Sequence, residues 1–381
     1  MPSTSALRYL VLAACAVIVY GSLYPFDFRP LQGGELRALS DSLLRLTTRG
    51  DILSNVILFV PLGLLARLAW PRQGWFTLLL WSGALALAVQ LAQLFLPSRD
   101  ASLQDVLWNL LGVALGAASA GLVRRLRAWG LPIATDDAFA LGLLGLWLAA
   151  RLTPFVPSLD WQLIKDSLKP LLLHPQWDGV RILVQTALWA VAARLWWAVW
   201  RGPARLPLYF AGAAAVFALE AITVANVVTL PSVLGATLGG LLWGLVLSRR
   251  RWGDAALAVF LMAALVIQGL APFQLRPVAE PFRWLPMHGF LQGLSLFNVG
   301  VLLAKAYFYG ALLWMARREG ASLRFATALA VSLTFALELV QTRITGHTPE
   351  ITDPLIALAM AALYRALAPG RAVSTESPRL R

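Results

Sequence analysis

Long apolar stretches recur along the whole chain and leave little room for a water-soluble fold. They are about 18 to 22 residues long, which is enough to cross the roughly 30 Å hydrocarbon core of a bilayer as α-helices. Hydrophobic residues make up 59% of the 381 positions and charged residues only 13%, whereas soluble domains carry about 25% charged residues. The sequence therefore predicts an all-α protein, a polytopic transmembrane helical bundle.

The apolar stretches predict about twelve helices, bounded by charged residues, proline or glycine. Their predicted ranges are 7–24, 51–70, 74–96, 103–123, 137–153, 179–200, 206–227, 230–248, 254–271, 296–316, 322–344 and 350–367. The segment 369–381 is short and polar, and we expect it to be a disordered tail.

The distribution of positive charge predicts the orientation of these helices. With the N-terminus inside, the inner connections carry 19 of the 32 Lys and Arg residues but only 5 of the 19 acidic residues. This is the positive-inside pattern, so we expect a multi-pass protein of the cell membrane with both termini in the cytoplasm. The net charge of +13 does not indicate nucleic-acid binding, because the cations are scattered between apolar stretches. Membrane lipids are the expected partners.

Two sequence landmarks recur three times at similar separations. The first is a Pro-Phe pair after the first helix of each predicted unit, at Pro25-Phe26, Pro154-Phe155 and Pro272-Phe273. The second lies near the end of the third helix, at Gln90/Gln93, Glu220/Thr223 and Glu338/Gln341. They predict three parallel four-helix repeats, at residues 1–128, 129–250 and 251–368.

The first predicted unit carries a dense set of polar residues within apolar helices. Several are spaced three or four apart, as Asp51 and Asn55 are, and therefore share a helix face. A carboxylate at the membrane centre costs roughly 2.5–3.5 kcal/mol, so such residues should face protein or water. The candidate ligand-binding residues are Asp51, Asn55, Gln90, Gln93, Arg99, Asp105 and Asn109. The same set could instead form an interhelical hydrogen-bond network that only fixes packing.

The first unit resembles the VanZ-like family of integral membrane proteins, which is named for a protein associated with teicoplanin resistance. The resemblance covers roughly residues 10–120. It rests on Pro25-Phe26, Asn55 with Phe59-Val60-Pro61-Leu62-Gly63, and then Gln93, Arg99, Asp105, Asn109 and Gly112. The family usually has Glu three residues before the Gln, where this chain has Gln90. The resemblance implies a role in the cell envelope and a link to antibiotic resistance, but no agreed reaction.

The other two units keep only parts of this pattern. The secondary candidate residues are Glu220, Glu338, Gln341, His347 and Asp353. In the second unit Gly235 and Gly239 replace the Asp and Asn, and in the third unit Lys305 replaces Asn55. With only three His and no paired Cys or HExxH motif, we expect no metal and no cofactor.

The sequence favours a non-enzymatic envelope protein that binds or shields a lipid-linked or glycopeptide-type ligand at the outer leaflet. An Arg99–Asp105 pair would suit an anionic headgroup, because Arg binds phosphate with a bidentate fork. A transporter or flippase that uses Glu220 and Glu338 at the repeat interface is the first alternative. A membrane enzyme on a lipid-phosphate substrate is the second, although no nucleophile–base pair can be assembled from one unit.

Overall fold

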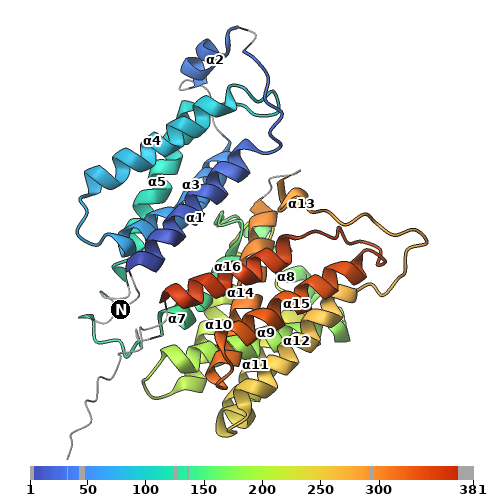
Figure 1. Ribbon diagram of the computed structural model, residues 1–381. Helices are drawn as coiled ribbons and strands as arrows, with labels where there is room; N and C mark the ends of the chain where they lie inside the picture. Colours follow the sequence, from blue (N-terminus) through green and yellow to red (C-terminus); the bar gives the residue numbers. More distant parts are fainter. Residues whose placement is uncertain are drawn as a thin grey trace, which may run out of the picture.

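The computed structural model describes residues 4–31, 33–42, 48–122, 125, 128–134, 137–291 and 296–367, and in this part of the chain it is all-α (Figure 1). The first long helices are α1 (Thr4–Leu23), α3 (Arg49–Ala69), α4 (Trp75–Gln93) and α5 (Leu103–Ser119). Next come α7 (Ala138–Leu152), α9 (Gly179–Val199), α10 (Arg205–Ala221) and α11 (Leu230–Leu241), the last extended by a π turn to Val246 and a 3-10 turn to Arg249. The last are α12 (Gly253–Leu270), α14 (Leu296–Arg318), α15 (Leu323–Gln341) and α16 (Thr352–Leu367).

Each of the twelve predicted ranges coincides with one of these helices, and the all-α class is confirmed. Seven helices are long and apolar enough to cross a membrane, and α1 and α7 contribute shorter apolar segments. Twelve membrane crossings stay a prediction.

The largest boundary error is at α10, which ends at Ala221 rather than near residue 227. The apolar residues after it form a loop instead, in which the Val224 amide donates to the Val156 carbonyl of another loop. Among the described residues, three short helices in the loops were not predicted: α2 (Glu35–Asp41), α8 (Trp161–Leu172) and α13 (His288–Leu291).

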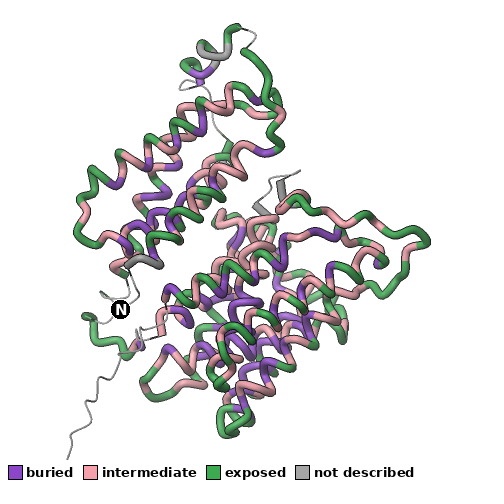
Figure 2. Tube along the Cα trace, in the orientation of Figure 1, coloured by how far each residue is buried: buried purple, intermediate pink, exposed green. Residues whose placement is uncertain are grey.

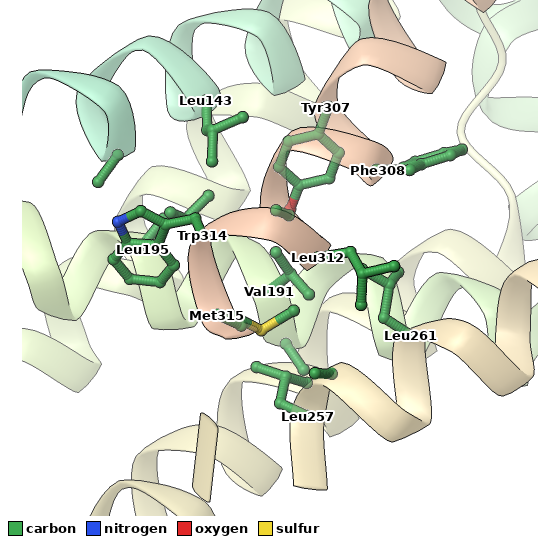
Figure 3. Packing of buried hydrophobic residues seen from close by; sticks show 14 of the residues in the cluster. Leu143, Val191, Leu195, Leu257, Leu261, Tyr307, Phe308, Leu312, Trp314 and Met315 are labelled. Atoms are coloured by element: carbon green, nitrogen blue, oxygen red, sulfur yellow. The ribbon is translucent and has the colours of Figure 1, made fainter. Parts of the chain in front are cut away.

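The helices pack around two main cores. The smaller core lies between α1, α3, α4 and α5 and includes Phe59 and Leu62. The larger core is shared by helices from the second and third predicted units, so these two units form one body (Figure 1). At its centre α14 places Tyr307, Leu312 and Trp314 against α7, α9 and α12 (Figure 3).

Exposed residues recur along the long helices (Figure 2), and many of them are large hydrophobic residues. Phe76 on α4 is 78% exposed, Val259 on α12 is 60% exposed, and Phe325 on α15 is 61% exposed. Apolar surface of this extent is unfavourable in water and is favourable against lipid chains. The exposed faces therefore agree with a bundle surrounded by hydrocarbon.

Helices α3 and α5 make the closest contact in the first body. A Cβ atom added at Gly63, Gly112 or Gly116 would overlap a backbone carbonyl of the facing helix, at Val113, Val56 or Val60 respectively. Small residues at such a contact let two membrane helices approach backbone to backbone. This contact places the first turns of α3 and α5, and the polar residues on them, side by side.

We expect Gly116→Val to lower the free energy of unfolding by about 1–3 kcal/mol or more, because the new side chain forces α3 and α5 apart. Thermal unfolding of the detergent-solubilised chain would measure the change. Gly142→Val is the matched control, since Gly142 has no heavy atom within 4 Å of an added Cβ. Equal midpoints for the two variants would contradict the packing argument.

Candidate functional site

The polar residues of the first body divide into two groups, and the first group holds the end of α1. Pro25 has no N–H, so the carbonyl of Gly21 lacks its helical donor, and further carbonyls at the helix end also need partners. Arg99 supplies donors to the Gly21 carbonyl at 3.3 Å and to the Tyr24 carbonyl at 3.0 Å. Gln93 donates to the Ser22 carbonyl at 2.9 Å. Gln93 and Arg99 therefore close the end of α1.

Arg99 lies in the loop between α4 and α5, and its guanidinium is half-buried. This burial lowers the pKa of Arg99 below its ordinary value, and the nearby negative charge of Asp27 partly opposes the shift. In the described structure Arg99 donates to α1 carbonyls rather than to Asp105. Its contacts therefore give no support to an Arg99–Asp105 pair.

The second group lies where α3 begins, α4 ends and α5 begins. Gln90 bridges two of these elements: its Oε1 accepts the Ser102 amide at 2.8 Å, and its Nε2 lies 3.5 Å from Asp105 Oδ2. The Asn55 amide and the Asp51 carboxylate also lie near Asp105. Three predicted residues thus lie around the carboxylate of a fourth, and we call these four residues the Asp105 cluster.

Helix termini account for the position of both carboxylates in the Asp105 cluster. Asp51 is in the first turn of α3, where Thr48 Oγ1 accepts the Asp51 amide and donates to its Oδ2 at 2.6 Å. Asp105 is in the first turn of α5, which Ser102 caps. Negative charge at a helix N-terminus is favoured by the macrodipole, so local structure alone supports these two residues.

Asn109 lies one turn deeper on α5 and is only 2% exposed. Its Oδ1 is buried and has no hydrogen-bond partner among the described residues. A buried carbonyl oxygen without a donor is unfavourable by about 1–3 kcal/mol. Asn109 is therefore the member of the predicted set whose position packing and hydrogen bonding explain least.

The third predicted unit repeats several of these contacts. Gln341 donates to the Gly269 carbonyl at 2.9 Å, and His347 hydrogen-bonds the Ala271 carbonyl at 2.6 Å, as Gln93 and Arg99 do at α1. Glu338 accepts the Glu350 amide at 2.8 Å, as Gln90 accepts the Ser102 amide.

Asp353 in this unit has a cation beside it. Lys305 Nζ lies 2.6 Å from its Oδ1, and the Tyr309 hydroxyl donates to its Oδ2, also at 2.6 Å. The carboxylate is therefore neutralised and hydrogen-bonded from inside the protein.

The second predicted unit holds a buried ion pair between Arg151 of α7 and Glu220 of α10. Arg151 also donates to Gln185 Oε1 at 3.3 Å and to Ser232 Oγ at 2.6 Å. The sequence predicted Glu220 as a candidate residue but did not predict its partner. An arginine inside a predicted apolar helix was the available signal, because such charges are usually paired.

Among the described residues, no three His, Cys, Asp or Glu side chains converge in a way that could hold a metal ion. Within the same residues, hydrogen bonding and ion pairing are the chemistry that the polar clusters offer.

Residues 9–124 match the family model described as VanZ/LLP1. The resemblance of this region to the VanZ-like family is thereby confirmed. The VanZ-like region spans α1 to α5 and contains all seven predicted ligand-binding residues. No curated protein and no solved structure matches the chain. Whether the seven residues bind a ligand stays a prediction.

We expect Arg99→Leu to loosen the end of α1, because charged hydrogen bonds of this kind contribute about 1.5–3 kcal/mol each. Hydrogen–deuterium exchange of peptides covering residues 20–31 should rise. Arg72→Leu is the control, since exposed Arg72 lies in the turn between α3 and α4. Unchanged exchange in the Arg99 variant would contradict the capping role.

Proposed function

We propose that the chain is an envelope membrane protein whose VanZ-like region binds the headgroup of a lipid-linked or glycopeptide-type ligand at the outer leaflet. The observation that carries this proposal is the convergence of Asp51, Asn55, Gln90 and Asp105 at one end of the bundle. Carboxylate and amide oxygens accept hydrogen bonds, so the cluster suits hydroxyl and amine groups better than phosphate.

The unpartnered Oδ1 of Asn109 supports the same proposal. It lies one helical turn below Asp105, and a ligand hydroxyl or a bridging water would satisfy it. The third unit differs at the corresponding carboxylate, which is Asp353. Lys305 and Tyr309 already donate to it, so the contrast with Asp105 supports the proposal. Among the described ion pairs, none involves Asp51 or Asp105, which leaves both carboxylates available for a ligand.

We expect Asp105→Asn to weaken ligand binding about tenfold or more, because a charged acceptor becomes neutral. Teicoplanin and a lipid-linked disaccharide, titrated separately into the purified full chain, are suitable probes. Asp100→Asn is the matched control, since Asp100 is an exposed carboxylate in the adjacent loop. If Asp105→Asn binds both probes as the unmodified chain does, the cluster is structural and the proposal fails.

We propose in addition that three parallel four-helix repeats built the chain. Three turns support this: the amides of Phe26, Phe155 and Phe273 each donate to the residue three positions before, and all three have left-handed φ values of 61° to 66°. The peptide bond before the proline is cis in each turn. The Gln93 and Gln341 bonds to matching carbonyls support the same relationship.

The positive-inside pattern predicts that the Asp105 cluster lies outside, with the N- and C-termini in the cytoplasm. We expect a cysteine at Ser98 to react with a membrane-impermeant maleimide on intact cells, in a Cys15→Ser background. A cysteine at Arg72 should react only after the membrane is opened. Both positions are exposed in the protein, so accessibility reports the side of the membrane. The reverse labelling pattern would place the cluster inside.

A further inference from the structure

A cavity of about 320 Å³ lies between the second and third predicted units, away from the Asp105 cluster. Helices α7, α9, α10, α12 and α14 and the loop after α10 contribute to its wall. Val227, which is half exposed, lies on this wall and marks where the cavity meets the protein surface.

The polar side of the cavity centres on the Arg151–Glu220 pair. The three donor nitrogens of Arg151 bond to Glu220, Gln185 and Ser232, so its hydrogen-bonding capacity is largely used. Glu220 is only 4% exposed, and its Oε1 forms the ion pair with Arg151. Its Oε2 is buried and has no partner among the described residues. Glu220 contributes to the cavity wall, so a carboxylate oxygen beside the cavity has no donor among the described residues.

Part of the cavity wall is aromatic. Trp147 of α7 and Tyr307 and Phe308 of α14 contribute to its wall. Tyr307 donates its hydroxyl to the Leu188 carbonyl at 2.9 Å, so this group is engaged within the protein. Aromatic rings facing a few placed polar groups are typical of sites for small organic ligands.

We propose that this cavity is a second binding site, for the uncharged, hydroxyl-rich headgroup of a glycolipid. A hydroxyl would donate to Glu220 Oε2, and the C–H faces of a sugar ring would pack on the aromatic wall. Because Arg151 and Glu220 compensate each other, a charged headgroup would introduce a net charge that nothing in the cavity balances.

This site is independent of the Asp105 cluster, because the two share no residue and lie around different cores. Glu220 occupies the position in the second unit that Gln90 occupies in the first, but the surroundings differ. Gly235, at the position of Asp105, packs its backbone against Gln185, and an added Cβ would overlap that side chain. Of the two positions that correspond to Gln90 and Asp105, only the first, on α10, carries a carboxylate in the second unit.

The test is native mass spectrometry of the full chain with monoglucosyl diacylglycerol as the probe. Glu220→Gln should weaken its binding about tenfold to a hundredfold, because a charged hydrogen bond is lost. Ala304→Phe, which fills the cavity from α14, should abolish binding to this site. Asp166→Asn is the control, since Asp166 is an exposed carboxylate on α8 of the same unit.

Two further ligands identify the chemistry. Phosphatidylglycerol should bind without dependence on Glu220, whereas Glu220-dependent binding of methyl glucoside alone would show that a free sugar suffices. Retention of glycolipid binding in both Glu220→Gln and Ala304→Phe would overturn the proposal, and if Ala304→Phe does not fold, Glu220→Gln decides alone. Asp105→Asn should leave Glu220-dependent binding intact, so failure of one site is distinguishable from failure of the other.

Discussion

Pro25, which follows the end of α1, lacks a backbone N–H donor. Side chains of the first body supply hydrogen-bond donors to the end of this helix instead. Membrane helices must satisfy their backbone polar groups internally, because hydrocarbon offers no hydrogen bonds. The Tyr24 and Phe26 amides donate to the Tyr20 and Leu23 carbonyls. Arg99, in the loop after α4, donates to the Gly21 carbonyl, and Gln93, the last residue of α4, donates to the Ser22 carbonyl. The ends of α1, α4 and α5 are thereby fixed together.

The polar residues of the VanZ-like region fall into two groups, according to whether they bond the carbonyls at the end of α1. Gln93 and Arg99 reach α1 and make its end rigid. Gly112 and Gly116 let α5 pack closely against α3. This helix contact brings Asp105 and Asn55 near each other. The polar residues left over, at the first turns of α3 and α5, are then held by a scaffold that does not need them for its own closure.

The sequence predicted the helices well, because each apolar stretch is as long as a membrane is thick and ends at charge, proline or glycine. It failed where apolar residues form loops, as after Ala221, since hydrophobicity does not distinguish a buried loop from a helix end. It identified Glu220 but not Arg151, because the two are 69 positions apart and only packing brings them together. The unpartnered oxygens of Asn109 and Glu220 likewise depend on geometry that no spacing encodes.

The three predicted units each hold a carboxylate near helix ends, and they differ in the side chains that lie beside it. In the third unit Lys305 and Tyr309 saturate Asp353, so little binding capacity is left. In the second, Arg151 pairs with one oxygen of Glu220, and the other oxygen is buried beside a cavity without a partner among the described residues. In the first, the neighbours of Asp105 are uncharged amides and a second carboxylate. Asp105 and Asp353 occupy matching positions whereas Glu220 does not, so the three units differ both in where the carboxylate lies and in which side chains surround it.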